Sequence, residues 1–354
     1  MPDQKAVRRV VDIITGTWQA QALYAAVAFG LADHVAAGDV TDEALAARTQ
    51  ASPDGIRRLM RLLTAMDVFE RTPGERTGEA AGSDADGDTP GAPRSGGYRL
   101  TPAGELLRAD SPQSMRDMIR IYGEEFHRAW GAVEPAVRTG TSGFQHAFGK
   151  TLHEYLRDPQ AGAKFQRAMN AGNVFFPDVL DAFDFTHCRT VVDVAGGSGM
   201  LLGTVLRAHP HLRGILFDQP HMLPVARTHL DEAVGRGRYE ALAGDLFEGV
   251  PPGADVYLLS RVLQDWDDPR CTALLSHIRA ALPESGRLLI LERVVPDDGE
   301  TLLPLLYDLH LLMAAGGRER DLAGYRAVLA SAGLRLESVH ALSLETSLLV
   351  AAVA

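Results

Sequence analysis

Cysteine is nearly absent from this sequence: its 354 residues include only Cys188 and Cys271. Two cysteines exclude a framework of several disulfides and a cysteine-rich metal cluster, and they favour a protein of the reducing cytoplasm. No apolar stretch is long enough to cross a bilayer, and Arg8, Arg9 and Asp12 interrupt the N-terminal apolar residues that a signal peptide would need. We therefore expect a cytoplasmic protein with no membrane partner and no metal site.

Positive charge is also in deficit, because 46 acidic residues outnumber 35 lysines and arginines. A net charge of −11 repels phosphate backbones, so nucleic acid is not an expected partner. One helix, predicted to begin at Ser52-Pro53, carries Arg57, Arg58 and Arg61 opposite its apolar face, as a DNA-recognition helix would. In an acidic chain, a solvated helix face is the simpler explanation.

Large apolar residues are almost missing from residues 72–97, which are rich in Gly, Pro, Asp and Ser. This composition predicts a disordered segment or a floppy surface loop. The flanking residues 68–71 and 98–101 have the pattern of two short strands, so the segment is expected at the tip of a lengthened hairpin. Residues 1–110 are thus predicted to form a mainly helical domain with a winged-helix unit.

A glycine-rich turn is the most informative feature that is present. Val191, Val192 and Val194 favour a buried parallel strand, the residues Gly196-Gly197-Ser198-Gly199 follow it, and residues 201–208 have a helical pattern. Glycines allow a tight turn and a close approach of the backbone to a ligand. Such a turn alone is weak evidence, since a dinucleotide site or an ordinary turn explains it equally well.

Acidic residues at successive strand ends strengthen the case. Asp218 ends the next apolar strand, about 20 residues after the last glycine, which is the spacing of an acid that accepts ribose hydroxyls. Asp245 follows the strand after that, where a carboxylate can accept a hydrogen bond from the adenine amino group. With Asp193 this makes three acids, a pattern that solvated turn residues explain poorly. The pattern predicts a site for an adenosyl cofactor.

The C-terminal part alternates strands and helices, which predicts a doubly wound α/β sheet with an antiparallel pair at one edge. Strands are expected at 190–194, 214–217, 238–243, 255–260, 287–292, 334–342 and 347–353. Ligands of such sheets bind at the carboxyl ends of the strands. We expect three parts: a winged-helix-like domain (1–110), a helical region (111–185) and a Rossmann-like cofactor-binding domain (186–354).

Six segments together resemble the S-adenosylmethionine-dependent small-molecule O-methyltransferases, which include plant caffeate-type enzymes and bacterial antibiotic-pathway relatives. The segments are 193–199 (DVAGGSG), 217–220 (FDQP), 244–247 (GDLF), 261–268 (RVLQDWDD), 291–293 (LER) and 316–320 (GGRER). The resemblance covers nearly the whole chain. It implies S-adenosyl-L-methionine as cofactor, a homodimer formed by the N-terminal domain, and methyl transfer to a hydroxyl of a small aromatic or polyketide-type substrate.

The resemblance also implies which residues bind the cofactor. They lie on the glycine turn, at the ends of the next two strands and at the end of the fourth: Asp193, Gly196, Gly197, Gly199, Asp218, Gln219, Gly244, Asp245, Leu246, Phe247, Ser260 and Arg261. Ser260 stands where many relatives carry Lys, and its hydroxyl can still hydrogen-bond the cofactor.

The family's base is commonly a His in a His-Asp-Trp motif after the fourth strand, and here that position is Gln264. An amide cannot accept a proton near neutral pH. Glu292 and Glu319 stand where the family uses carboxylates to hold the imidazole, so they are expected either to position Gln264 or to bond the substrate. Alternatively, Glu292 is a buried strand-end acid and Glu319 a surface ion-pair partner of Arg318 or Arg320. His310 is a reserve candidate for the base.

Substrate residues are expected in the helical region, which in the family closes over a flat aromatic substrate. Most aromatic residues at helical spacing belong to the core. The candidates for contact are Phe126, Trp130, Phe148, Phe165, Met169 and Asn170, with Asp308 from a later helix.

The missing imidazole leaves several functions open. A phenol acidified by its neighbours can ionise by itself, and methyl transfer then depends on proximity and orientation. The fold can also retain S-adenosylmethionine while catalysing a cyclisation, a pericyclic step or a hydroxylation. C-methylation and, more distantly, a winged-helix regulator without enzymatic activity are further alternatives.

Overall fold

The structure, a computed structural model, describes residues 3–72, 96–296 and 301–354. These residues form two compact units, one ending at Glu124 and one beginning at Glu125. The three-part division expected from the sequence stays a prediction. Most of the segment 72–97, expected to be floppy, lies outside the described residues.

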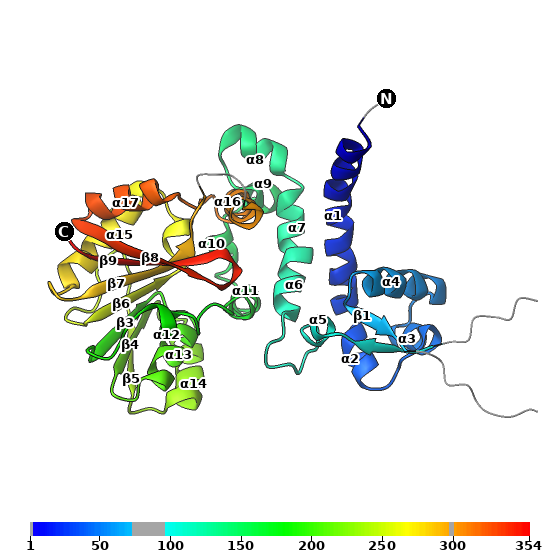
Figure 1. Cartoon of the computed structure of the whole chain (residues 1–354), viewed down its shortest axis with the longest axis horizontal. Helices are drawn as coiled ribbons and strands as arrows, with labels where there is room; N and C mark the ends of the chain where they lie inside the picture. The colour runs from blue at the N-terminus through cyan, green and yellow to red at the C-terminus, as the bar shows by residue number, and fades with distance from the viewer. Residues whose placement is uncertain (1–2, 73–95, 297–300) are drawn as a thin grey trace, which may run out of the picture. The chain divides into compact units, whose positions relative to one another are not determined.

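The first unit consists of helices, the longest of which is α1, and a two-stranded hairpin (Figure 1). Its elements are α1 (Gln4–Ala28), α2 (Leu31–Ala36), α3 (Asp42–Thr49), α4 (Pro53–Ala65), β1 (Phe69–Arg71), β2 (Tyr98–Leu100), α5 (Pro102–Glu105) and α6 (Arg116–Gly123). The strands β1 and β2 pair antiparallel, and the N–H of Thr72 donates to the carbonyl of Gly97 at 2.9 Å. The predicted hairpin is confirmed.

Helix α4 begins as predicted, with the Ser52 hydroxyl accepting from the N–H of Gly55 and Pro53 in the first turn. Its apolar face packs into the core of the unit. On its other face, both Arg57 and Arg58 form ion pairs with Asp54. These exposed pairs are what a solvated helix face shows.

The second unit begins with short helices and continues with a seven-stranded sheet. The helices before the sheet are α7 (Glu125–Trp130), α8 (Val133–Thr139), α9 (Gly143–Phe148), α10 (Leu152–Tyr155), α11 (Pro159–Ala171) and α12 (Val179–Ala182). The strands are β3 (Thr190–Val194), β4 (Arg213–Asp218), β5 (Tyr239–Ala243), β6 (Val256–Ser260), β7 (Arg287–Arg293), β8 (Leu334–Leu342) and β9 (Thr346–Val353). The elements between them are α13 (Met200–Ala208), α14 (Leu223–Val234), the 3₁₀ turn η1 (Leu263–Asp265), α15 (Asp268–Ala281), α16 (Leu302–Ala314), α17 (Leu322–Ser331) and the 3₁₀ turn η2 (Ser343–Glu345).

The strand order is β5-β4-β3-β6-β7-β9-β8. The first five strands of this order are parallel, and β9 pairs antiparallel with both β7 and β8. Every side chain of β7 after Arg287 is buried, whereas exposed and covered residues alternate along the edge strand β8. This contrast is what burial on two faces and at an edge produces. The predicted strands, their boundaries within one or two residues, and the antiparallel edge are confirmed.

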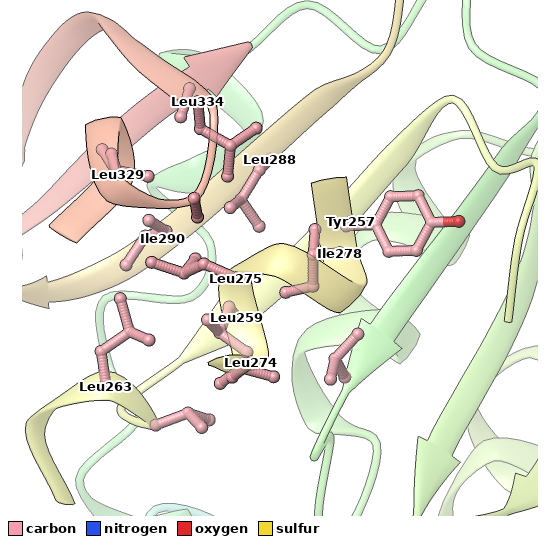
Figure 2. Packing of buried hydrophobic residues seen from close by; sticks show 14 of the residues in the cluster. Tyr257, Leu259, Leu263, Leu274, Leu275, Ile278, Leu288, Ile290, Leu329 and Leu334 are labelled. Atoms are coloured by element: carbon pink, nitrogen blue, oxygen red, sulfur yellow. The ribbon is translucent and has the colours of Figure 1, made fainter. Parts of the chain in front are cut away.

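Two hydrophobic clusters cover the two faces of the sheet. One joins α15 and α17 to β6, β7 and β9, and Figure 2 shows Leu274, Leu275 and Ile278 of α15 packing among Leu288, Ile290 and Leu329. The other joins α12, α13 and α14 to the opposite face. Figure 1 shows these two helix layers on either side of the sheet. With both faces covered, ligands have access at the strand ends.

In the described ranges, no helix combines the length and the hydropathy of a membrane span. The same residues contain no group of three or more His, Cys, Asp or Glu side chains arranged to hold a metal ion.

Candidate functional site

The glycine turn joins β3 to α13 through left-handed backbone. Gly197 and Gly199 have φ values of +59° and +75°, which strain residues with a side chain. A Cβ atom on Gly199 would lie 2.9 Å from Leu230 Cδ1, and one on Gly197 would lie 3.0 Å from Gln166 Nε2. The turn therefore presents backbone, rather than side chains, at the carboxyl end of β3, which fits a nucleotide-like ligand.

Asp193 lies beneath this turn. Its side chain is 1% exposed, and its Oδ2 accepts from the N–H of Leu202 in α13 at 3.3 Å. Burial raises the pKa of Asp193 to about 7. A Cβ atom on Gly196 would lie 2.7 Å from the Asp193 carboxyl group, so the two residues are in close contact. In this geometry Asp193 supports the turn from below.

Asp218 ends β4 and is tied to the same turn. Its Oδ2 accepts from the N–H of Gly197 at 2.7 Å, and its Oδ1 accepts from the N–H of Gln219 at 2.6 Å. Burial raises the pKa of Asp218. Each carboxylate oxygen can accept two hydrogen bonds, so both retain one acceptor position. A ribose diol offers two donors, and this acid fits it.

Helix α11 contacts the glycine turn through Asn170. The Asn170 Oδ1 accepts from the Ser198 hydroxyl at 2.9 Å and from Gln166 Nε2 at 3.0 Å. Phe165 and Met169 are half-buried on the same helix. The amide oxygen of Asn170, which was expected to orient a substrate, thus accepts a hydrogen bond from the glycine turn.

Arg261 connects the end of β6 to the end of α11. Its backbone is left-handed, with φ +53°, and its guanidinium donates to the Met169 carbonyl at 3.2 Å and to Asn173 Oδ1. The preceding Ser260 hydroxyl is buried and has no hydrogen-bond partner among the described residues. A strained residue beside an unpartnered hydroxyl is a combination found at binding sites.

The loop after β5 carries Gly244, Asp245, Leu246 and Phe247. Asp245 is exposed, and its Oδ1 accepts from the N–H of Phe247 at 2.9 Å. The Phe247 ring lies 5.1 Å from the Trp266 ring, edge to face. Trp266 therefore joins this loop to the loop that carries Gln264.

The segment 261–268, which follows β6, is called the Gln264 loop below. Glu292, at the end of β7, hydrogen-bonds the backbone of this loop. Its Oε1 accepts from the N–H groups of Val262 at 2.9 Å, Leu263 at 2.6 Å and Gln264 at 3.3 Å, and its Oε2 accepts from the Tyr325 hydroxyl at 2.7 Å. The side chain is 0% exposed, and burial raises its pKa. Glu292 thus determines where the Gln264 backbone lies.

Arg320 holds the other side of this loop. Its side chain is 4% exposed, and it donates to the carbonyls of Leu263 at 3.0 Å and Trp266 at 2.8 Å and to Asp268 Oδ1. The N–H of Arg318 donates to the Gln264 carbonyl at 2.8 Å. A Cβ atom on Gly317 would collide with that same carbonyl oxygen. Donors on one segment and a carboxylate on another thus fix the loop from both sides.

Glu319 is buried, with 4% exposure, which excludes the surface ion-pair alternative. Its two neighbours, Arg318 and Arg320, pair with Asp268 instead. Burial, followed by the charge of Glu292, raises the pKa of Glu319 to about 9, so its carboxyl group is protonated at neutral pH. Both its oxygens, and the Gln264 Oε1, are buried and have no partner in the described part of the chain.

His310 is an unsuitable reserve base. Its Nδ1 accepts from Trp130 Nε1 at 3.1 Å, and burial lowers its pKa to about 4. The Phe126 ring packs edge-on against it, with centroids 4.6 Å apart. Asp308, nearby on α16, accepts from the N–H of Glu319 at 2.9 Å. The two α16 side chains therefore bond different partners.

Phe148 belongs to another aromatic cluster. It stacks on Phe144 with centroids 4.2 Å apart, with Arg128 over its ring and Tyr155 beside it. These contacts do not connect it to the Gln264 loop. Sequence reasoning missed Tyr325, Arg320, Gln166 and Asn173, which position the site. Only Arg320 among these four could have been found from the sequence, because it lies in the segment 316–320, in which Glu319 was the predicted site residue.

Comparisons with known proteins show the family of this chain. A family model described as the O-methyltransferase domain matches residues 130–335, and the O-methyltransferase dimerisation domain matches residues 11–110. The chain is 41% identical to the 3-amino-4-hydroxybenzoate 4-O-methyltransferase of Streptomyces cremeus, over 98% of this chain and 90% of the relative. It is 37% identical to the phenazine-1-carboxylate N-methyltransferase of Pseudomonas aeruginosa, over 98% of this chain and 97% of the relative.

Two solved structures show the same fold. The pyocyanin biosynthetic protein PhzM has a TM-score of 0.83 at 37% identity, covering 99% of this chain and 100% of that one. The O-methyltransferase NcsB1 from neocarzinostatin biosynthesis, in complex with S-adenosylmethionine and 2-hydroxy-5-methyl naphthoic acid, has a TM-score of 0.75 at 29% identity, covering 95% and 96%. The predicted fold class and cofactor are confirmed. The chain belongs to the S-adenosylmethionine-dependent O-methyltransferases with an N-terminal dimerisation domain.

Proposed function

We propose that this enzyme methylates a hydroxyl group of a small aromatic or polyketide-type natural-product intermediate. The observation that carries the proposal is the arrangement at the carboxyl ends of the parallel strands. The glycine turn, Asp218 and the Gln264 loop lie at the ends of β3, β4 and β6. Related enzymes support the substrate class, since one is named for 3-amino-4-hydroxybenzoate and another holds 2-hydroxy-5-methyl naphthoic acid.

The cofactor supplies an electrophilic methyl group on a sulfonium when bound. The backbone of the glycine turn would accommodate its polar tail, and Asp218 with Gln219 would hold the ribose. Asp245, Leu246 and Phe247 would border the adenine, and Ser260 beside Arg261 would contact the methionine portion, where a buried hydroxyl has no partner in the described residues. Asp193 and Gly196 would keep the turn in shape.

We place Gln264 where related enzymes carry a His. Its amide cannot take a proton at neutral pH, so its contribution is orientation. In the transfer, an oxygen lone pair forms the new C–O bond while the C–S bond breaks toward sulfur. Alignment of these three atoms is the main contribution of the protein, and well-oriented reactants can gain about 7–11 kcal/mol over free ones.

We propose that the residues predicted from the sequence to contact the substrate do so. Phe126 and Trp130 pack against His310, which supports an aromatic cluster on the α7 and α16 helices. Asp308 lies next to Glu319. Asn170, Met169 and Phe165 come from the helix that contacts the glycine turn, and Phe148 comes from the neighbouring cluster.

We further propose a cytoplasmic homodimer formed through α1. This helix exposes a series of large apolar side chains, which a monomer would leave in water: Val7, Val10, Val11, Ile13, Ile14 and Trp18, each 46–65% exposed. Patches of this kind mark protein interfaces. The match to a dimerisation domain supports a second copy of this chain as the partner.

The test is mass spectrometry of the enzyme with S-adenosylmethionine and a panel that includes 3-amino-4-hydroxybenzoate, 2-hydroxy-5-methyl naphthoic acid and hydroxyquinones. We expect a product heavier by one methylene with an equal amount of S-adenosylhomocysteine, and fragmentation should place the methyl on oxygen. A converted substrate without S-adenosylhomocysteine would refute methyl transfer in favour of a cyclisation, pericyclic step or hydroxylation. A methyl group on carbon would refute the O-acceptor.

A further inference from the structure

Three buried oxygen atoms on two adjoining segments have no hydrogen-bond partner in the described residues: Gln264 Oε1 and both carboxyl oxygens of Glu319. A buried polar atom that makes no hydrogen bond costs about 1–3 kcal/mol, and such atoms are rare in native proteins. Here they come from two segments in direct contact, because the Arg318 N–H donates to the Gln264 carbonyl. Unpartnered buried oxygens on two adjoining segments are what a site for a ligand that bonds both side chains would show.

Both segments are fixed independently of any ligand. The Glu292 carboxyl group holds the backbone of the Gln264 loop, and Asp308 accepts from the N–H of Glu319 at 2.9 Å. The Glu319 carboxyl group is therefore presented by rigid elements, as preorganised catalytic groups are. Neither of its oxygens has a partner within residues 3–72, 96–296 and 301–354, whereas both oxygens of Glu292 accept hydrogen bonds from the protein.

The surroundings of Glu319 set its proton affinity. After burial, the charges of Glu292 on β7, Asp308 on α16 and Asp265 on η1 raise its pKa, while Arg293 on β7 lowers it, with a result of about 9. A base is most effective when its proton affinity is near that of the group it deprotonates, and phenolic hydroxyls have pKa values near 10. An ordinary carboxylate is far too weak for this step.

We propose that Glu319 is the catalytic base of this enzyme, taking the hydroxyl proton of the acceptor in the place where relatives use an imidazole. The proton of the acceptor hydroxyl passes to a Glu319 carboxylate oxygen, and the O–H electron pair stays on the acceptor oxygen. This oxygen forms the C–O bond with the methyl group, and the C–S electron pair goes to sulfur. Gln264 Oε1 then accepts from a second donor on the substrate or from water. The inference rests on the proposed O-methylation and adds that Glu319 receives the hydroxyl proton of the acceptor.

The experiment measures kcat/KM from pH 6 to 10 with the panel member that is methylated fastest. For the native enzyme we expect log kcat/KM to rise with pH up to about 9. Glu319→Gln, which matches the shape of the protonated acid, should lose about 10²- to 10⁴-fold, the usual contribution of a general base. It should also lose the rise. The proposal would be overturned if Glu319→Gln kept kcat/KM within threefold of the native value and also kept its rise with pH.

Two further variants exclude a merely structural effect. Asp308→Asn removes a charge that raises the pKa of Glu319, so the rise should move to lower pH. Gln264→His combined with Glu319→Gln should recover activity, with the rise now near pH 6.5, because a histidine ionises there. If both variants kept the native pH profile, Glu319 would not be the base.

Infrared spectroscopy with S-adenosylhomocysteine bound gives a readout that does not depend on turnover. A protonated carboxyl band that titrates near pH 9 and is missing in Glu319→Gln is expected. Absence of such a band from the native enzyme would refute the base assignment. Failure of the proposed function looks different: no panel member would yield a methylated product, while the band would still titrate.

Discussion

Arg320 and Arg318 bind the same carboxylate, and the structure predicts very different consequences of losing each. Arg320 has 4% of its side chain exposed and donates to Asp268 and to the carbonyls of Leu263 and Trp266. Arg318 has 54% of its side chain exposed and pairs with Asp268 at 2.8 Å. We therefore compare Arg320→Ala with Arg318→Ala as its matched control.

The magnitude follows from the bonds lost. Each charged hydrogen bond from Arg320 to a carbonyl contributes about 1.5–3 kcal/mol, so two of them amount to about 3–6 kcal/mol. The pairs with Asp268 add little, because that carboxylate is half exposed and surface pairs contribute about 0–1 kcal/mol. At about 2–4 °C per kcal/mol, Arg320→Ala should lower Tm by about 6–24 °C, and Arg318→Ala by about 4 °C at most.

Thermal unfolding followed by circular dichroism measures both variants under one set of conditions. Arg320→Lys is a useful third variant, because a single ammonium lacks the fork that reaches two carbonyls and a carboxylate, and it should resemble Arg320→Ala. Equal losses for Arg320→Ala and Arg318→Ala would refute the reasoning, since they would show that the carbonyl bonds contribute nothing.

Three further predictions concern the cofactor, pH and assembly. Asp218→Ala should raise the S-adenosylmethionine Kd about 100-fold or more, since two bonds to a charged acceptor are lost, and unchanged affinity by calorimetry would contradict the ribose contact. Because the pKa of Glu319 is raised to about 9, the native state binds this proton more tightly than the unfolded chain, so the free energy of unfolding falls as pH rises from about 4.5 to 9. Glu319→Gln should flatten that part of the pH profile of urea unfolding, and an unchanged slope would show that folding does not raise the pKa of Glu319. Ile14→Asp places a charge on the exposed apolar face of α1 and should shift sedimentation toward monomer, whereas a persistent dimer would exclude this face as the interface.

The sheet was predictable because its strands carry a strong local signal. Near-continuous apolar runs such as residues 287–292 are typical of strands buried on both faces, and their boundaries agree with the structure within one or two residues. The glycine turn was equally local, since its left-handed residues need glycine. The site residues around it stay predictions that the geometry supports.

The roles of individual side chains were less predictable, because they depend on contacts between distant segments. The sequence does not distinguish Arg318 from Arg320, which alternate along one segment, yet one is exposed and the other is buried. The burial of Glu319 was not predicted, since it depends on the close approach of Gly317 to the Gln264 carbonyl. Asn170 was expected to orient a substrate, which stays a prediction, and the sequence did not predict the hydrogen bond from the Ser198 hydroxyl to its amide oxygen.

The Gln264 loop is held by its backbone, so we expect that residue 264 can be substituted without loss of the fold. Glu292 accepts from three N–H groups of the loop, and Arg320 with the Arg318 N–H binds its carbonyls, so these bonds do not involve the residue-264 side chain. Gln264→His keeps all these backbone bonds and removes a side-chain hydrogen bond to Asp265, which contributes about 0.5–1.5 kcal/mol, so it should lower Tm by about 1–6 °C, less than Arg320→Ala does. In a Glu319→Gln background, the same change should restore a base. A fall in Tm comparable to that of Arg320→Ala would show that the amide side chain itself holds the loop, and the substitution would then alter geometry as well as chemistry.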